Sequence, residues 1–248
     1  MLKKFYPKKS YLERTIEALS MISSLLDLFL PPYCVVCNRA LHPWEDFLCL
    51  SCSLQLPETR YHQWQDNPMR LHLLEVFTVH QATALFFYEM DGATAQLIHQ
   101  MKYNNQKKIG HYCGYRLGLQ LESFSSFKVI DAVIPVPLHP KRERKRGYNQ
   151  VFAFAQSLAN CLNAQFYPTA LKRIRHTPYL AQTTAEERHQ IIANAFELHP
   201  AMHNSKPQHF LLVDDVMTTG ATLIACGRAL NCEQKNRLSI ATIAYRQS

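Results

Sequence analysis

The sequence predicts an α/β fold: a doubly wound parallel sheet preceded by a small N-terminal module that binds a metal. From about residue 71 onward, apolar β-branched runs alternate with amphipathic segments, as in strands joined by right-handed helical crossovers. One run, Lys128–Val136, is almost continuously apolar, which is typical of a strand buried on both faces of a parallel sheet. Ahead of this region stand two C-x-x-C pairs, which predict a separate metal-binding segment.

We expect the chain to divide at a linker. Residues 1–60 would contain a basic tail, an amphipathic helix over Tyr11–Leu30 and the cysteine pairs, and residues 71–248 would form the sheet domain. The stretch between them, Tyr61–Arg70, is polar and includes Pro68, which favours a connection without regular structure.

Each element of the sheet domain follows from its own pattern. β-branched and aromatic residues indicate strands, apolar residues three and four apart indicate helices, and Asp91 is an N-cap residue. In chain order these signals predict one or two strands within Val76–Tyr88, helices over Asp91–Tyr103 and Lys108–Glu122, a strand at Lys128–Val136, a helix over Val151–Leu162, a short strand within Ala164–Leu171, a strand at Phe210–Val213, a helix over Gly220–Leu230 and a last strand at Leu238–Tyr245.

Charge and missing motifs narrow the function. The 248 residues carry a formal net charge of +8, which favours polyanionic partners. The patterns G-x-G-x-x-G, G-x-x-x-x-G-K-[ST], H-E-x-x-H and G-x-S-x-G are missing from the sequence. Their absence argues against Rossmann dinucleotide enzymes, P-loop NTPases, zincin proteases and α/β-hydrolases.

The apolar stretch Ala18–Leu30 lacks the features of a membrane-spanning helix or an export signal. No run reaches the ~20 apolar residues that a membrane-spanning helix needs. Asp27 interrupts the stretch and Pro31-Pro32 follows it, unlike the small-residue site of a cleaved signal peptide. We therefore expect a cytoplasmic protein with no transmembrane segment.

Four cysteines are spaced for one metal ion. Cys34 and Cys37 form one C-x-x-C pair, Cys49 and Cys52 form another, and eleven residues separate the pairs. Two such knuckles direct four thiolates to one tetrahedral Zn²⁺. Four protein ligands close the coordination shell, so the zinc would be structural rather than catalytic. A disulfide or a redox pair is the alternative interpretation.

The most informative segment joins a strand to a helix. Ligands of open α/β sheets bind where strands end, and a helix N-terminus offers unpaired N–H groups with partial positive charge. Three threonine hydroxyls and a glycine complete a cradle that suits a phosphate monoester. After the apolar run Phe210–Val213, this cradle is formed by Asp214, Asp215, Val216, Met217, Thr218, Thr219, Gly220, Ala221 and Thr222.

The two neighbouring carboxylates need a separate explanation. Consecutive strand residues point to opposite faces, so Asp214 and Asp215 reach one ligand only where the pleat breaks, and we expect the break at this point. As hydrogen-bond acceptors they suit a vicinal diol with a divalent cation nearby. A sugar phosphate with free hydroxyls satisfies both halves of the motif.

This segment resembles the fingerprint of the type I phosphoribosyltransferases, which bind 5-phosphoribosyl 1-pyrophosphate (PRPP) with Mg²⁺. The resemblance implies that Asp214 and Asp215 hold the ribose hydroxyls and that Val216–Thr222 wraps the 5-phosphate. The alternative is an ordinary helix cap with an acidic first turn.

A cationic segment follows the strand at Lys128–Val136. Three prolines, at 135, 137 and 140, fix the backbone just before it. Mobile cations at a rigid strand end suit pyrophosphate or a nucleic-acid backbone, and a solvated basic loop is the alternative. The pyrophosphate loop of a phosphoribosyltransferase occupies the same place. The cations are Lys141, Arg142, Arg144, Lys145 and Arg146.

The order of these motifs resembles that of the ComF family, whose members join a Cys₄ zinc module to a type I phosphoribosyltransferase-like sheet. The resemblance runs from about Leu28 to Tyr245 and includes Met101-Lys102-Tyr103 and Arg146–Gln150. It implies that Lys102 and Arg146 lie near the pyrophosphate.

The region after Leu171 resembles the family's flexible loop. The sequence names no general base there, because Glu186 and Glu187 are better explained as solvated acids. The residues that the resemblance makes candidates for contact with pyrophosphate or nucleic acid are Lys141, Arg142, Arg144, Lys145, Tyr148, Arg173, Arg175 and Arg188.

The resemblance implies three alternative functions. The first is a PRPP-binding protein of natural transformation (competence) that handles incoming single-stranded DNA in the cytoplasm, with further competence-pathway proteins as partners. In this case Tyr103 and Tyr148 would stack on bases. The second is an active phosphoribosyltransferase that displaces pyrophosphate from PRPP with an unknown acceptor. The third is a PRPP-responsive nucleic-acid-binding regulator without turnover.

Overall fold

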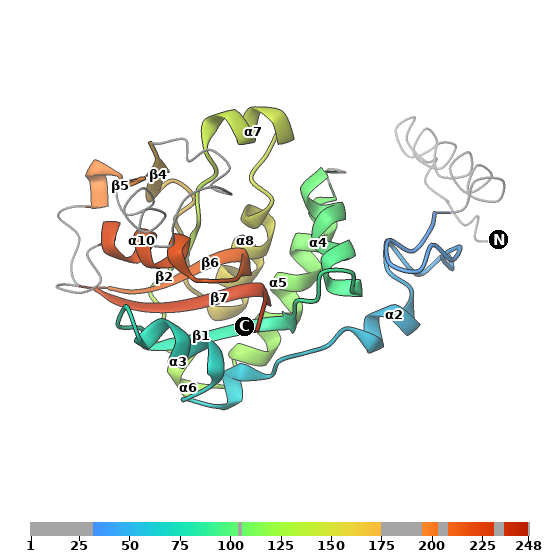
Figure 1. Cartoon of the computed structure of the whole chain (residues 1–248), viewed down its shortest axis with the longest axis horizontal. Coiled ribbons are helices and arrows are strands. Elements are labelled where there is room, and N and C mark those ends of the chain that lie inside the picture. Colours follow the sequence, from blue (N-terminus) through green and yellow to red (C-terminus); the bar gives the residue numbers. More distant parts are fainter. Residues whose placement is uncertain (1–31, 104–105, 175–194, 203–207, 231–235, 248) are drawn as a thin grey trace, which may run out of the picture. The chain divides into compact units, whose positions relative to one another are not determined.

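The computed structural model describes residues 32–103, 106–174, 195–202, 208–230 and 236–247 (Figure 1). The chain divides into two compact units, Met1–Leu54 and Gln55–Ser248. The predicted helix over Tyr11–Leu30 lies outside the described residues. Among those that are described, no helix is both long and apolar enough to cross a membrane.

The first unit is built around the two C-x-x-C pairs. Tyr33 and Ala40 form an isolated antiparallel bridge, and the N–H of Val35 donates to the carbonyl of Phe47 at 2.9 Å, which joins the two pairs. Helix α2, Leu50–Gln55, begins within the second pair. Among its described residues the only buried apolar side chains besides cysteines are Leu41, Phe47 and Leu48, a core so small that it needs a metal or a disulfide to hold it.

The second unit is a five-stranded parallel sheet in the order β1-β7-β6-β2-β3. This confirms the predicted fold class, an α/β fold with a parallel sheet. A separate antiparallel pair joins β4 to β5. The strands are β1 (Gln81–Phe87), β2 (Ala132–Pro135), β3 (Gln165–Phe166), β4 (Leu171–Arg173), β5 (Phe196–Leu198), β6 (His209–Met217) and β7 (Arg237–Tyr245).

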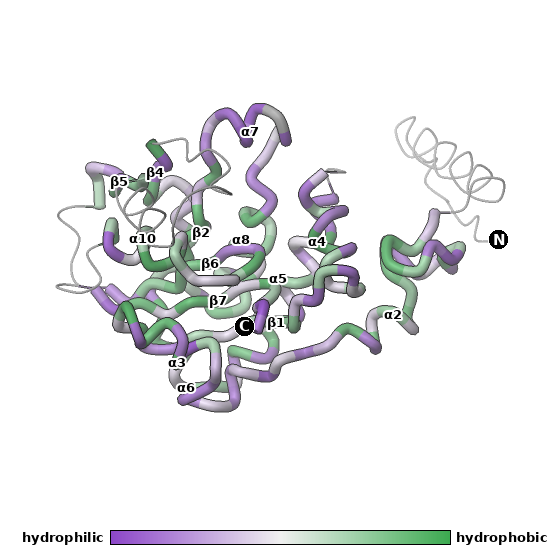
Figure 2. The backbone as a smooth tube through the Cα atoms, viewed as in Figure 1, coloured by the Kyte–Doolittle hydropathy of each residue, from purple (hydrophilic) through white to green (hydrophobic). Residues whose placement is uncertain are grey.

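Helices cover both faces of the sheet. Phe210 and Leu212 of β6 pack in one cluster with α3 and α10, whereas alternate residues of β6 face α8, which contacts β2 and β6. Figure 2 shows the central strands as largely hydrophobic and α7 as hydrophilic. The helices are η1 (Tyr61–Gln63), α3 (Pro68–Leu74), α4 (Ala93–Tyr103), α5 (Lys107–Leu121), α6 (Ser125–Lys128), α7 (Pro140–Arg146), α8 (Val151–Leu162), η2 (Pro200–Met202) and α10 (Ala221–Ala229).

Three glycines allow α5 to lie close against α8. Gly110, Gly114 and Gly118 are spaced four apart and fall on one face of the helix. A Cβ at Gly114 would lie 2.5 Å from the carbonyl oxygen of Phe154, and one at Gly118 would lie 2.6 Å from Cβ of Cys161. The close approach therefore fixes α8, which carries site residues at its N-terminus.

The predicted linker over Tyr61–Arg70 is wrong, because this stretch forms η1 and the start of α3. Asn67 is fully buried. Its amide N–H donates to the carbonyl of Ala82 in β1 at 2.8 Å, and its Oδ1 accepts from the N–H of Arg70 at 3.0 Å, capping α3. Its amide N–H also donates to the carbonyl of Tyr61 at 3.1 Å, so one polar side chain serves the backbone of η1, α3 and β1. The compact unit begins at Gln55.

The basic stretch predicted as a loop is instead the helix α7. The side chain of His139 accepts from the N–H of Lys141 at 3.2 Å, Pro140 lies in the first turn, and Gly147 ends the helix at φ 78°. Proline at the start and glycine just past the end are ordinary helix signals, which the run of charges obscured. Likewise, the one strand predicted within Ala164–Leu171 is two short strands, β3 and the start of β4.

The expected break in the pleat at the acidic pair is also wrong. Strand β6 pairs with β7 as far as Met217, with Asp214 opposite Thr242 and Val216 opposite Ala244. The long partner strand supplies hydrogen-bonding groups along the whole edge, so the alternation of side chains continues through both aspartates.

Candidate functional site

The acidic pair and the threonine-rich loop lie at the carboxyl end of β6, next to the N-terminus of α10. Asp214, Asp215, Val216 and Met217 belong to the strand, Thr218 and Thr219 form the bend that follows, and Gly220 caps α10, whose first turn contains Ala221 and Thr222. This strand–loop–helix arrangement is the one predicted from the sequence.

A recess of about 50 Å³ lies in this loop, lined by Asp214 and residues 216–223. Since one water needs roughly 10–15 Å³ on this measure, the recess holds a group with a few oxygen atoms, the size of a phosphate. Gly220 has φ 73°, and a Cβ there would lie 2.8 Å from Cδ2 of Leu73. A glycine is therefore required to bring the backbone N–H groups of α10 to the recess.

Asp215 faces α4 and α8, where it is held by two partners. Its Oδ2 lies 2.9 Å from Nζ of Lys102 and accepts from Nε2 of Gln150 at 2.8 Å. Oε1 of Gln150 in turn accepts from Nη1 of Arg146 at 2.9 Å. Lys102, Asp215, Gln150 and Arg146, which come from α4, β6 and the two ends of the α7–α8 connection, thus form one Asp215 network.

Gln150 is the residue of this network that was not among the predicted site residues. The signal for it was present, since it ends the Arg146–Gln150 motif. Its partner Asp215 stands 65 positions away, so only the fold reveals why the glutamine is there.

Asp214 faces the opposite way, towards α10 and β4. Burial and the neighbouring Asp215 carboxylate raise the pKa of Asp214 to about 8, although the N–H of Asp215 and the charges of Lys102 and Arg173 oppose this. The N–H of Asp215 donates to Oδ1 of Asp214 at 2.8 Å. Asp214 therefore holds its proton more tightly than an isolated aspartate does.

The two aspartates consequently lie on opposite sides of one strand end. A ligand in contact with both must lie across the carboxyl edge of the sheet, with the recess on the Asp214 side and the Asp215 network on the other. The resulting site offers oxygen acceptors in its middle and cationic or N–H donors at both ends, an arrangement that suits an elongated anion with hydroxyl groups.

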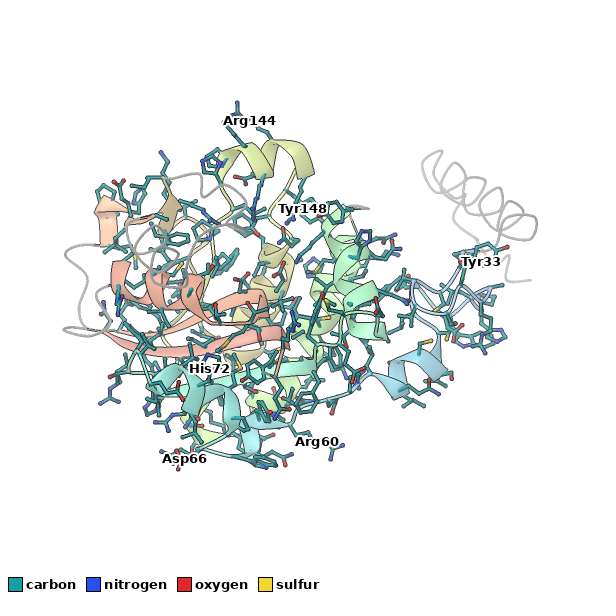
Figure 3. All side chains as sticks on the ribbon, viewed as in Figure 1. Tyr33, Arg60, Asp66, His72, Arg144 and Tyr148 are labelled. Atoms are coloured by element: carbon teal, nitrogen blue, oxygen red, sulfur yellow. The ribbon has the colours of Figure 1, made fainter. Side chains whose placement is uncertain are left out.

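The cations of α7 divide into two sets. Lys141, Arg142 and Arg144 are exposed, and Figure 3 shows Arg144 projecting outward from the helix. Arg146 instead turns towards Gln150 and lies over the ring of Tyr103, 5.4 Å from its centre. Lys145 belongs to the same helix. Three cations are thus presented to solvent, while Arg146 belongs to the site.

The two tyrosines expected to stack on bases already have contacts. The hydroxyl of Tyr148 donates to the carbonyl of Met101, and Nζ of Lys107 lies 5.6 Å from the centre of its ring. The ring of Tyr103 lies 4.7 Å from that of His99 at a tilt of 42°, and the guanidinium of Arg146 lies over it. Tyr148 is thus held against α4, whereas Tyr103 contacts Arg146 but stays 57% exposed.

The flexible-loop candidates are only partly described. Arg173 lies in β4, half-buried, with its guanidinium over the ring of Phe196. Burial, followed by the charge of Arg142, lowers the pKa of Arg173, and the charge of Asp214 opposes this. Arg175 and Arg188 lie outside the described residues, as do Glu186 and Glu187.

The four cysteines of the first unit come together as predicted. Their sulfur atoms all lie within 4.8 Å of one another, and Sγ of Cys37 lies 3.7 Å from Sγ of Cys49. Zn–S bonds of ~2.3 Å in a tetrahedron put sulfurs roughly 3.8 Å apart. The N–H of Cys49 donates to Sγ of Cys34 at 3.4 Å and that of Cys52 to Sγ of Cys49 at 3.5 Å. The tetrad therefore fits a metal ion with thiolate ligands.

Comparison with known proteins agrees with this geometry. Residues 151–248 match the model of the phosphoribosyl transferase domain. The chain is 29% identical over 195 residues to Competence protein F of Haemophilus influenzae, which covers 77% of this chain and 75% of that protein. It is also 29% identical over 205 residues to DNA utilization protein YhgH of Escherichia coli K12, covering 79% and 83%.

A crystal structure of adenine phosphoribosyltransferase is 16% identical, with a TM-score of 0.36 and coverage of 61% of this chain and 74% of that chain. The relatives and the matched domain confirm the resemblance stated from the sequence. The chain is homologous to Competence protein F and YhgH and contains a phosphoribosyl transferase domain at residues 151–248.

Proposed function

We propose that this protein binds PRPP with Mg²⁺ across the carboxyl edge of its sheet and acts in competence by handling single-stranded DNA in the cytoplasm. The observation that carries the PRPP proposal is the phosphate-sized recess at the N-terminus of α10, directly beside two carboxylates. A phosphate site next to a diol acceptor suits a phosphorylated sugar better than a free phosphate or a nucleobase.

The 5-phosphate would bind in the recess. Backbone N–H groups of residues 218–222 and the hydroxyls of Thr218, Thr219 and Thr222 are its donors. Charge-assisted hydrogen bonds contribute ~1.5–3 kcal/mol each, so a few of them suffice for micromolar affinity.

The ribose hydroxyls would meet the aspartates, and the pyrophosphate would lie towards Lys102 and Arg146. Mg²⁺ prefers oxygen ligands and is commonly held by one or two carboxylates together with substrate phosphates, a set that Asp214, Asp215 and PRPP supply. When bound, Mg²⁺ would neutralise charge on the pyrophosphate. The Lys102–Asp215 ion pair would open as the lysine turns to the ligand.

A ligand series tests the geometry of this proposal. We expect calorimetric titration with Mg²⁺ to give the affinity order PRPP, ribose 5-phosphate, pyrophosphate, because only PRPP reaches the recess, the aspartates and the cations together. The double substitution Thr218→Val/Thr219→Val should weaken the binding of ribose 5-phosphate and of PRPP but not that of pyrophosphate. Ser125→Ala, on an exposed residue of α6, is the control. Pyrophosphate as the tightest ligand would contradict the assignment of the recess.

Single-stranded DNA is the proposed macromolecular partner, alongside other proteins of the competence pathway. The exposed cations of α7 (Lys141, Arg142 and Arg144) suit a phosphate backbone. The names of the relatives, Competence protein F and DNA utilization protein YhgH, support the same role.

Transfer chemistry is the second candidate function, favoured by the matched domain. An active phosphoribosyltransferase would release pyrophosphate from PRPP when its acceptor is present. A regulator that uses PRPP only as an effector would change its DNA affinity with PRPP and release no pyrophosphate. Measuring both in the same mixture with single-stranded DNA separates the two.

The cysteine tetrad is proposed to bind a structural Zn²⁺. Four protein thiolates close the coordination shell, and a segment with so small a core gains its folding free energy from the metal.

A further inference from the structure

A second cavity, larger than the phosphate recess, lies between α7, the start of α8 and β4. Its volume is about 330 Å³, which falls within the ~300–1,000 Å³ typical of small-ligand sites. No residue of the loop Asp214–Leu223 lines it. It is therefore distinct from the recess proposed for the 5-phosphate, although its lining residue Arg173 lies near enough to Asp214 for their charges to interact.

The walls of this cavity are mainly apolar and include flat groups. Pro137 and Leu138 follow β2, Pro168 precedes β4, Leu171 is the first residue of β4, and Phe152 comes from α8. Phe152 is half-buried and packs edge-on against Phe166, with ring centres 6.3 Å apart and planes at 85°. Proline and phenylalanine rings offer surfaces against which a planar ring stacks.

One wall is held rigid by a buried amide. Asn149 lines the cavity and is 2% exposed. Its N–H donates to the carbonyl of Val136 at 3.0 Å, and its Oδ1 accepts from the N–H of Val151 at 3.1 Å. The loop after β2 and the start of α8 are thus tied together, so the cavity is preformed.

Cations line one side of the cavity and lie on the neighbouring helix α7. Lys172 and Arg173 line the cavity, and Arg142 belongs to α7, whose Pro140 and Glu143 also line it. Arg142 lies near enough to Arg173 for the two positive charges to repel. An anion between them would relieve this repulsion, and of the lining residues only Glu143 is acidic.

We propose that this cavity binds a nucleotide, with its base between Phe152 and the proline rings and its phosphate at Arg142, Lys172 and Arg173. An apolar cavity with flat groups in its walls and cations on one side matches a planar ring that carries an anionic group. PRPP has no planar ring, so the two sites take different ligands. The inference deepens the proposed role with single-stranded DNA and rests on it only for the source of the nucleotide.

Two probes distinguish that source, thymidine 5′-monophosphate and a fluorescent 12-nucleotide oligo(dT). Calorimetry measures the first, and fluorescence anisotropy at two salt concentrations measures the second. Comparable affinity for both indicates a site for free nucleotides. Much tighter, salt-dependent binding of the oligonucleotide indicates that the base belongs to a strand whose backbone follows α7.

Variants test the cavity itself. Phe152→Ala removes the aromatic wall and Leu138→Trp fills the interior. Each should weaken the better-bound probe about tenfold, as loss of one stacked base does. Lys172→Ala should weaken it several-fold and reduce the salt dependence. The controls are Tyr115→Ala, on an exposed aromatic residue of α5, and Lys128→Ala, on an exposed lysine of α6.

The outcomes are separable from those of the proposed function. If neither probe binds, or if Leu138→Trp and Phe152→Ala fold and bind both probes as the wild type does, the inference is overturned. PRPP titration of the same variants reports folding and the other site independently. If neither the wild type nor any variant binds PRPP while nucleotide binding is intact, only the PRPP proposal is overturned.

Discussion

At the scale of single residues, the acidic pair shows how a strand assigns different chemistry to neighbouring side chains. Asp215 is paired with Lys102 and Gln150. Asp214 lies on the other face, where burial and the like charge of Asp215 disfavour its ionised form. The composition of the pair was evident from the sequence, but its division into two roles depends on which face each side chain occupies.

The raised pKa of Asp214 predicts a pH-dependent stability. The folded state retains the proton up to about pH 8, whereas an unfolded aspartate loses it near its usual 3.8. This favourable contribution is therefore complete below pH ~4 and is lost as pH rises to ~8. The Asp214→Asn variant has no carboxyl group to titrate at this position. As the pH rises across that range, its melting temperature should therefore increase relative to that of the wild type, by roughly 2–4 °C for each kcal/mol that the wild type loses.

Thermal unfolding at pH 5, 6.5 and 8 checks this expectation. Asp66→Asn is the control, because the Asp66 side chain is 72% exposed. A difference between Asp214→Asn and the wild type that does not change with pH would show that Asp214 is already ionised.

Gly220 and Gly147 share a left-handed backbone conformation. Alanine substitutions at the two positions therefore distinguish the effect of backbone strain from that of steric crowding. Gly220 has φ 73° and Gly147 has φ 78°, so alanine at either position costs ~1–2 kcal/mol of left-handed strain. At Gly220 the new Cβ would also lie 2.8 Å from Leu73, whereas nothing lies within 4 Å at Gly147. We expect Gly220→Ala to lower the free energy of unfolding, measured by denaturant titration, more than Gly147→Ala does. We also expect Gly220→Ala to weaken PRPP binding, measured by calorimetry. Equal effects at both positions would contradict the crowding at the recess.

At the scale of elements, the sequence predicted long apolar or amphipathic segments well and polar ones poorly. α4, α5, α8, α10 and β7 lie within one or two residues of the predicted bounds, because their periodicity reflects burial. α7 was missed, since five cations hide a helix whose start and stop signals are His139–Pro140 and Gly147. η1 and α3 were missed because Asn67 is polar yet buried.

The contact between α5 and α8 predicts a large effect of a small substitution. A Cβ at Gly114 meets the backbone oxygen of Phe154 at 2.5 Å, which a rotamer change cannot relieve. Gly114→Ala should destabilise the protein by ~1–3 kcal/mol, as overpacking does. At Gly92→Ala the nearest contact is a side-chain atom of Glu89 at 3.1 Å, so a smaller loss is expected. Urea unfolding measures both, and similar values would contradict the tight packing.

At the scale of the whole molecule, local sequence patterns predicted the individual helices and strands. They did not predict the contacts between residues that lie far apart in the chain. The cysteine tetrad could be predicted because its spacing encodes its geometry. The Asp215 network could not, because Lys102 and Gln150 lie 113 and 65 positions away from Asp215 in the chain. Parallel sheets bring distant strand ends to one edge, and the site forms there.

The two compact units predict that metal removal acts locally. The first unit has a very small core among its described residues, whereas the second has an extensive one. A chelator that extracts one zinc per chain should abolish hydrogen-exchange protection in residues 32–54 and leave the strands of the sheet protected. Cys52→Ser should do the same without a chelator. Retained protection at 32–54 in a metal-free protein would show that the cysteines are not a structural metal site.

The most direct measurement of the central claim is calorimetric titration of PRPP with Mg²⁺ into the wild type and into Asp214→Asn/Asp215→Asn. Asp66→Asn serves as the folded control. The account predicts micromolar binding to the wild type and to the control, and its loss in the double variant with the fold retained. Absence of binding to the wild type, or equal binding to the double variant, would contradict the assignment of this edge of the sheet to PRPP.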